Sequence, residues 1–258
     1  MPALFQIGDP SMGPVREKIL RFACVARTHV GCRRKINEDA MLSRPDLGLW
    51  AVADGMGGHE AGEVASALVV DMLQGAPAEP ELAPRMEAAR LALQKANRQL
   101  QSMAQSGGSR RTIGSTVVLV AVERTSFACL WAGDSRAYLA HDGVLQQLTR
   151  DHSLVQQLVD SGDIDPKLAS HHPNANIILR AVGAAPELEL DGVDGKVSAG
   201  DVFLLASDGL TRLVSDGEIL AELGAPDLEA AADRLLQMCL ARKAPDNVTF
   251  VIIRAHAQ

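Results

Sequence analysis

Three apolar runs that are typical of β-strands are each followed directly by an aspartate. "LWAVAD" ends at Asp54, "CLWAGD" at Asp134 and "FLLASD" at Asp208. A fourth aspartate, Asp246, comes just before the β-branched run "NVTFVII". Each of them alone would suit a turn, because aspartate and glycine are common turn residues. Their repetition at strand ends favours a shared site.

An antiparallel sheet would bring these carboxylates to one rim, because the start of one strand lies beside the end of its neighbour. Glu38 and Asp39, in "NEDAML", also precede a strand-like run, so up to six acids are expected there. Like charges this close stay ionised together only if cations neutralise them. Carboxylates without thiolates favour the hard ions Mg²⁺ or Mn²⁺. His59 is the one histidine close to these acids in the sequence. This scarcity of histidine argues against a zinc site.

An arginine beside these acids could hold an anionic substrate. "GCRRKINED" places Arg33 and Arg34 shortly before Glu38, and a guanidinium group binds phosphate oxygens with two hydrogen bonds. The residue types do not decide between the two arginines, and a solvated surface arginine is the alternative for either. Cations and an arginine together would suit a phosphate ester.

The stretch "DGMGGHEAGE", residues 54–63, has the glycine content of a loop that binds phosphate directly. A nucleotide-binding loop would read G-x-x-x-x-G-K-[ST] or G-x-G-x-x-G, and neither pattern is present. Asp54, Glu60 and Glu63 would repel a bare phosphate, and the stretch has no lysine to offset them. A nucleotide-binding module is therefore the weaker alternative, which ATP binding without metal would revive.

The elements that must position these residues follow one another as hairpins and helix pairs. Strands are expected at residues 19–27, 40–44, 47–53, 116–123, 126–133, 200–207 and 247–255, with a hairpin over 136–149 that turns at Asp142-Gly143. Helices are expected over 61–74, with Val64, Leu68 and Leu73 at helical spacing, and over 84–104, 216–223 and 227–242. This order favours an α+β class with mostly antiparallel sheets and helices packed outside them.

The totals describe an ordinary globular chain. Its 258 residues, 47% of them apolar, are enough for a sizeable core. A net charge of −7 argues against nucleic-acid binding. Residues 1–18 are expected to form a loose extension before a domain over 19–258. No apolar run is long enough for direct membrane insertion, no secretory signal is recognised, and the four cysteines form no C-x-x-C pair, so a cytoplasmic location is expected.

Several motifs occur together in the order and spacing of a known family. They are "GCRRKINED", "ADGMGGHEAGE", "GSTVV", "AGDSRAYL", "LTRDHS", "SDGL" and "PDNVT". Over about residues 20–254 the chain resembles the metal-dependent Ser/Thr protein phosphatases of type 2C (PPM family) in their compact bacterial form. The resemblance implies a four-layer α-β-β-α sandwich of two antiparallel sheets flanked by helix pairs. It also implies a flap beside the active site at about residues 151–182.

The resemblance implies a role for the acids in a centre that holds two Mn²⁺ or Mg²⁺ ions. Asp54 matches the carboxylate that bridges both ions. The carbonyl of Gly55 matches a ligand of the second ion, and Glu38 matches the acid that holds this ion largely through water. Asp208 and Asp246 match ligands of the first ion.

Other positions match further parts of the family's site. Arg34 stands three residues before "NED" and so matches the arginine that holds the phosphate. Asp134, with Asp208, matches the site of a third, weaker ion. Residues expected to support the ligands without binding the ions are Asp39, His59 and Asn247. The chain departs from the family pattern at His29, where many members have aspartate, and at Met56, where animal members carry a histidine proposed as general acid.

The reaction implied is hydrolysis of phosphoserine and phosphothreonine in proteins by a hydroxide that bridges the two ions. Phosphorylated proteins, a Ser/Thr kinase and the targets of that kinase are the expected partners, and a monomer is expected. One alternative is a phosphatase for small phosphate esters. Another is a non-catalytic relative that binds phosphoproteins, but such a relative would have lost a metal ligand, and the acids named above are all present.

Overall fold

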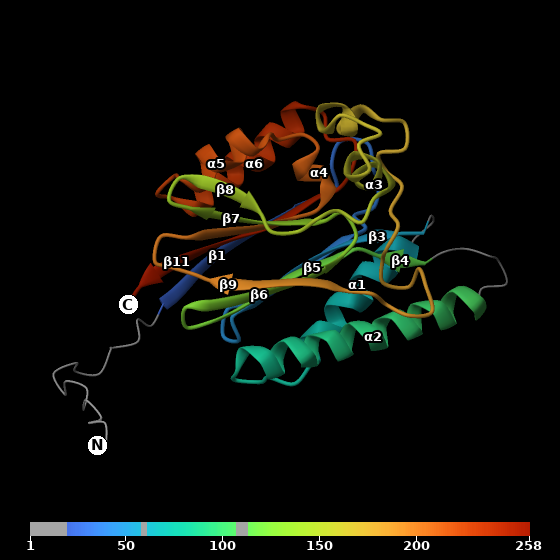
Figure 1. The fold of residues 1–258 in the computed structure, drawn as a ribbon, viewed down its shortest axis with the longest axis horizontal. Coiled ribbons are helices and arrows are strands. Elements are labelled where there is room, and N and C mark those ends of the chain that lie inside the picture. Colours follow the sequence, from blue (N-terminus) through green and yellow to red (C-terminus); the bar gives the residue numbers. More distant parts are fainter. Residues whose placement is uncertain (1–19, 58–60, 107–112) are drawn as a thin grey trace, which may run out of the picture.

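The computed structural model describes residues 20–57, 61–106 and 113–258. In this part of the chain two antiparallel sheets lie face to face between helices (Figure 1). One sheet has the order β1-β11-β10-β7-β8, formed by Leu20–His29, Val248–Ala257, Val202–Ala206, Arg136–His141 and Val144–Gln147. The other has the order β2-β3-β5-β6-β9, formed by Asp39–Arg44, Leu49–Met56, Val117–Glu123, Ser126–Ala132 and Asp191–Lys196, and β4 (Gly114–Ser115) pairs with β3.

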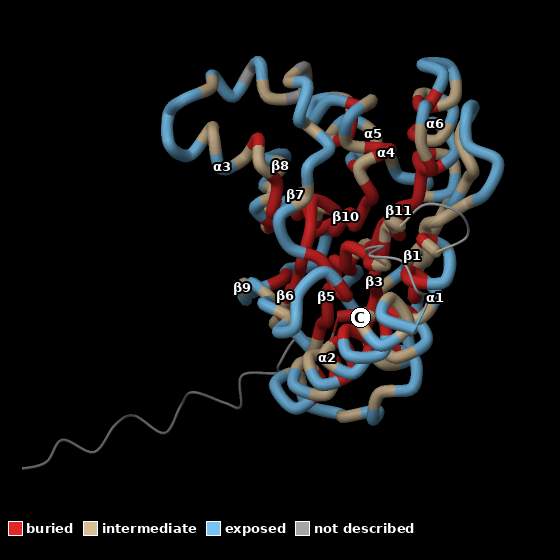
Figure 2. Tube along the Cα trace, turned by 90° about the vertical axis from the view of Figure 1, so that its right-hand side faces the viewer, coloured by how far each residue is buried: buried red, intermediate tan, exposed pale blue. Residues whose placement is uncertain are grey.

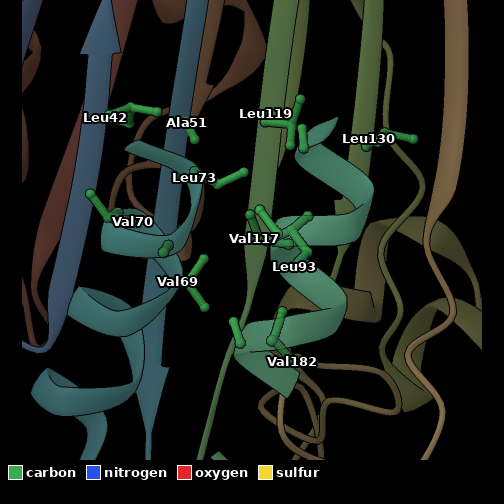
Figure 3. Packing of buried hydrophobic residues seen from close by; sticks show 14 of the residues in the cluster. Leu42, Ala51, Val69, Val70, Leu73, Leu93, Val117, Leu119, Leu130 and Val182 are labelled. Atoms are coloured by element: carbon green, nitrogen blue, oxygen red, sulfur yellow. The ribbon is translucent and has the colours of Figure 1, made fainter. Parts of the chain in front are cut away.

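Helices α1 (Ala61–Gln74) and α2 (Leu82–Ser106) cover the outer face of the β2–β9 sheet. Figure 3 shows Val69 and Leu73 of α1 and Leu93 of α2 pointing toward the sheet residues Ala51 and Leu119, and all of them are buried. Val64 was expected on this apolar face, and that expectation is wrong. Its side chain is 43% exposed, because Ala65, Val69 and Leu73 define the buried stripe instead.

Helices α5 (Asp216–Leu223) and α6 (Leu228–Ala241) cover the outer face of the β1–β8 sheet. Both helices begin at residues whose side chains satisfy free backbone N–H groups. Ser215 and Glu218 form a capping box at the start of α5, and the Asp227 carboxylate accepts hydrogen bonds from two backbone N–H groups at the start of α6. Capping fixes where each helix starts, and so which face packs on the sheet.

Three apolar clusters separate the four layers, and Figure 2 shows the buried residues concentrated in the middle of the molecule. One cluster lies under α1 and α2, and a second lies under α5 and α6. The third joins the inner faces of the sheets, where Trp50 and Val120 of one sheet meet Phe203 and Val251 of the other. This arrangement confirms the predicted α+β class and the four-layer sandwich.

The structure adds elements that were not expected from the sequence. Strand β9 reads "DGVDGK", which is typical of turns. It forms an edge strand beside β6, and its glycines make room for large side chains of that neighbour. A Cβ on Gly195 would lie 2.7 Å from the Phe127 ring. The short strand β4 and the short helix α4 (Asp208–Thr211) were also missed. The hairpin between β7 and β8 turns at Asp142-Gly143, as expected.

Residues 151–182 connect β8 to the far sheet through helix α3 (Leu154–Asp160) and the 3-10 helix η1 (Pro166–His171). One isolated bridge, Ser115 with Val182, ties the segment to the sandwich. Another, Ser153 with Ile178, joins two parts of the segment itself. In Figure 1 it lies beside α4, at one end of both sheets. None of the described helices is both long enough and apolar enough to span a membrane.

Candidate active site

Strand pairing brings the acids together at the end of the sheets beside α4. Asp39, the first residue of β2, is the direct antiparallel partner of Asp54 in β3. Ala206 pairs with Phe250, so Asp208 follows the end of β10 where Asp246 precedes the start of β11. The acids therefore meet where antiparallel pairing was expected to bring them, but Asp54 lies inside β3 and not after it.

Ser115 and Thr116, where β4 meets β5, hold both the N–H and the carbonyl of Asp54. Its N–H donates to the Thr116 hydroxyl at 3.0 Å. Its carbonyl accepts from the Thr116 N–H at 2.8 Å and from the Ser115 hydroxyl at 3.1 Å. Burial raises the pKa of the Asp54 carboxyl well above its usual value, and the carboxylates of Asp39 and Asp208 raise it further. A carboxylate fixed in this way needs a cation to stay ionised near neutral pH.

Asp39 lies beside Asp54, its strand partner, and is partly exposed. The Ser207 hydroxyl donates to its carboxylate at 2.9 Å. Burial raises the pKa of Asp39 to about 7, although hydrogen bonds from Thr249 and Ser207 lower it. Asp39 thus adds negative charge at the rim.

Gly55 lies in a tight contact with the first turn of α1 and with Glu38. Its N–H donates to the Glu38 carbonyl at 3.0 Å. A Cβ on Gly55 would lie 1.9 Å from the carbonyl oxygen of Gly62, so no larger residue fits. An ideal Cβ built on Gly62 would lie 2.3 Å from Glu38 Oε1 and 2.9 Å from the Gly55 carbonyl oxygen. Two oxygen donors therefore face one small space.

Arg34 connects the two sides of the rim. Its Nη1 donates to Glu38 at 3.1 Å, and its Nη2 donates to Asp246 at 2.8 Å. Burial lowers the pKa of Arg34, but the hydrogen bond and charge of Asp246 outweigh this, so the pKa is raised overall. Arg34, the arginine that the family resemblance favours over Arg33, is the one seen beside the acids.

Asp134 and Asp208 share a guanidinium group that sequence reasoning missed. Arg212 places Nε 2.9 Å from an Asp208 oxygen and Nη2 3.3 Å from Asp134 Oδ2. Burial raises the pKa of Asp134 to about 7, the Asp208 charge raises it and the Arg212 charge lowers it. Burial also raises the pKa of Asp208, and Arg212 opposes this. The i,i+4 spacing of aspartate and arginine in "DGLTR" was the available signal, but it required the unexpected helix α4.

The positions that depart from the family pattern lie near the site with limited roles. His29 ends β1, and its Nδ1 accepts a hydrogen bond from the Gly31 N–H at 2.9 Å, so it orders the turn before Arg34. Met56 pairs with Gly114 of β4 and carries no titratable proton. His59 lies outside the described residues.

Comparison with known proteins gives the family. The protein phosphatase 2C family model matches residues 22–157, just over half of the chain. The chain belongs to this family. Stp of Listeria monocytogenes, a serine/threonine phosphatase, is 34% identical over 235 residues, which are 88% of this chain and 93% of Stp. The serine/threonine protein phosphatase PstP of Mycobacterium tuberculosis is 38% identical over 91% of this chain, and the chain spans only 45% of its length.

Solved structures of similar proteins match most of the chain. PppA, described as a key regulatory component of the T6SS in Pseudomonas aeruginosa, has a TM-score of 0.86 at 42% identity, over 92% of this chain and 99% of that one. The catalytic domain of PstP, solved in complex with two manganese ions, has a TM-score of 0.80 at 35% identity, over 92% of this chain and 99% of that one.

The donor set of this phosphatase 2C domain fits hard divalent ions. No three of the described His, Cys, Asp and Glu side chains converge into a preformed metal cluster, because Arg34 and Arg212 lie between the carboxylates. Asp134 Oδ1, however, is buried and has no hydrogen-bond partner among the described residues. Carboxylates with raised pKa values, an oxygen without a hydrogen-bond partner and a carbonyl beside Glu38 are oxygen donors that suit Mn²⁺ or Mg²⁺.

Proposed function

We propose that this domain is a metal-dependent phosphatase that hydrolyses phosphoserine and phosphothreonine in proteins. The observation that carries the proposal is the placement of Arg34 between Glu38 and Asp246, near Asp54, whose pKa is raised by burial and by neighbouring aspartates. A guanidinium group next to ion-binding carboxylates is the arrangement that a phosphate monoester requires. Membership of the phosphatase 2C family supports the same reaction.

The residues divide between the two ions as their positions suggest. Asp54, whose carboxylate is affected by four other aspartates, would hold both ions. The Gly55 carbonyl and Glu38, which lie close together, would hold the second ion. Asp208 and Asp246, at adjacent ends of β10 and β11, would hold the first ion. Residues 19–258 form the phosphatase domain, with 151–182 as its flap.

When bound, the ions supply a nucleophilic water of lowered pKa and neutralise charge on the phosphoryl oxygens. The chain itself supplies orientation. Arg34 donates two hydrogen bonds to phosphoryl oxygens, and Glu38 and Asp246 hold its guanidinium group at the rim. Thr116 and Ser115 fix the backbone of Asp54, so its carboxylate does not reorganise during the reaction.

A protein substrate needs room beside the phosphorylated residue. A cavity of about 430 Å³ adjoins the acids and is lined by Asp134, Asp208, Arg136, Ser153 and Val214 among others. Its walls come from segment 151–182 and from residues 211–218, so flanking residues of a peptide could contact both. A small phosphate ester would leave this space unused.

The substrate class is tested by comparing kcat/KM for a phosphothreonine peptide with kcat/KM for a sugar phosphate, both with Mn²⁺. We expect the peptide to be preferred by at least about a hundredfold, because a few buried contacts contribute several kcal/mol. Equal or higher kcat/KM for the sugar phosphate would favour the small-ester alternative. Peptide binding without turnover would favour the non-catalytic alternative.

The setting of the enzyme follows from its substrates. A Ser/Thr kinase is the proposed source of the phosphoprotein. A cytoplasmic location is supported by the four cysteines, which are all free thiols. The proposed monomer is checked by light scattering after gel filtration, where a mass of twice 27.4 kDa would contradict it.

A further inference from the structure

The guanidinium group of Arg212 contacts segment 151–182 as well as the acids. Its Nη1 donates to the side-chain oxygen of Asn176, and its Nη2 donates to the Ala175 carbonyl at 3.2 Å. The same Nη2 lies 3.3 Å from Asp134, while Nε lies 2.9 Å from Asp208. The Arg212 side chain thus links Asp134, which follows β6, and Asp208, which follows β10, to the loop after η1.

The position between Asp134 and Asp208 is a place for positive charge. Asp134 is 5% exposed, and its Oδ1 has no hydrogen-bond partner in the described part of the chain. Two carboxylates this close to one guanidinium group would bind a divalent ion if that group left. They would not hold both cations together, because like charges repel strongly where water is excluded. Arg212 and an ion therefore compete for the same carboxylates.

We propose that Arg212 takes the place of a third ion between Asp134 and Asp208 and, from that place, latches segment 151–182 over the cavity beside them. An ion that binds there must displace Arg212 and so release Asn176 and Ala175. Release of the segment must in turn favour the ion, because such coupling is reciprocal. The inference rests on the proposed function only for the ion-binding role of the acids.

The first test counts the ions. Mn²⁺ bound per chain is measured by calorimetry, with elemental analysis, for the wild type, Arg212→Ala and Arg150→Ala. Arg150 is a matched control, since it pairs with Asp160 of α3 and not with the rim. We expect two ions in the wild type and in Arg150→Ala, and a third in Arg212→Ala. The same count in Arg212→Ala and the wild type would overturn the proposal.

The second test follows segment 151–182 by amide hydrogen exchange over residues 174–179. Exchange there should become at least about fivefold faster in Arg212→Ala, in line with the usual size of coupling between sites, and should stay unchanged in Arg150→Ala. Asn176→Ala, a substitution at an exposed position, should also speed exchange but should not create a third ion site. Unchanged exchange in Arg212→Ala would overturn the latch.

Neither test measures hydrolysis, so each is independent of the proposed function. Exchange in β11 serves as the folding control, because its amides are protected only in the intact sandwich. If the ion counts and exchange behave as expected but phosphopeptides are not hydrolysed, the proposed function fails and the role of Arg212 stands.

Discussion

The side-chain oxygen of Asn247 lies 2.8 Å from the backbone nitrogen of Glu38 and accepts its hydrogen bond. The amide nitrogen of Asn247 donates to the carbonyls of Val30 and Ile36, each at 3.0 Å. One buried amide therefore fixes the loop that carries Arg34 and Glu38 to the strand that follows Asp246. We propose on this basis that Asn247 supports the metal ligands, as expected for it from the sequence.

Replacing Asn247 by alanine should weaken both the fold and the metal centre. Each buried group left without a partner costs about 1–3 kcal/mol, so Tm should fall by about 5 °C or more. Mn²⁺ affinity, measured by calorimetry, should fall as well. Asn97→Ala is the matched control, because Asn97 is equally buried and bonds Gly183 and Ala185 away from the rim. A fall in Mn²⁺ affinity of equal size in both variants would contradict the role of Asn247.

Asp54→Asn should reduce kcat on a phosphothreonine peptide by at least about a hundredfold. The charge that the substitution removes is expected to stabilise the transition state by several kcal/mol. Asp201→Asn removes another buried carboxylate, one that pairs with His141, and should leave kcat near the wild-type value. Steady-state kinetics at saturating Mn²⁺ provide the measurement. Wild-type turnover in Asp54→Asn would refute the bridging assignment.

Arg34→Ala should lower kcat/KM by about 10- to 100-fold, the loss expected for hydrogen bonds to a charged group. Arg33→Ala makes the same change of charge at the neighbouring, exposed position and should have little effect. Phosphate inhibition gives a second readout, since inorganic phosphate should bind more weakly to Arg34→Ala alone. Equal losses in the two variants would show a general charge effect.

The pH dependence of stability should reveal the crowded acids. The folded pKa values of Asp39 and Asp134 are about 7, above the usual 3.8. The folded protein therefore binds more protons than the unfolded chain between about pH 4 and pH 7, and its stability falls as pH rises through that window. Tm measured in EDTA should decrease from pH 5 to pH 8.

Mn²⁺ should remove most of this decrease, because bound cations stabilise the ionised carboxylates. Asp134→Asn should make the decrease in EDTA smaller, since it removes one of the raised groups. A Tm in EDTA that rises steadily from pH 5 to pH 8 would show that the carboxylates are not crowded as the structure indicates.

Much of the site was predictable from the sequence because it depends on strand ends. An acid at the end of one strand and an acid at the start of the next must meet in an antiparallel pair, as Asp208 and Asp246 do. The choice of Arg34 over Arg33 needed the family resemblance, since no periodic pattern applies in that loop. In the structure Arg34 pairs with Glu38 and Asp246, and its binding of phosphate stays a proposal.

What escaped the sequence depends on contacts between distant segments. Arg212 belongs to the site only because α4 turns directly after Asp208 and because segment 151–182 passes over it. Strand β9 was missed because its glycines are typical of turns. The structure shows that a glycine is needed beside the Phe127 ring of β6, where a larger side chain would not fit. Val64 was assigned to the wrong face of α1. Several buried residues of this 14-residue helix are small, so its buried face does not stand out as apolar in the sequence.

We propose that bound divalent ions are required for hydrolysis of a phosphorylated protein side chain. This requirement is tested most directly by the rate of phosphate release from a phosphothreonine peptide before and after exhaustive chelation, and again after Mn²⁺ is restored. We expect phosphate release to fall to the background rate on chelation and to return with Mn²⁺. Release that continues at the original rate after chelation would contradict it.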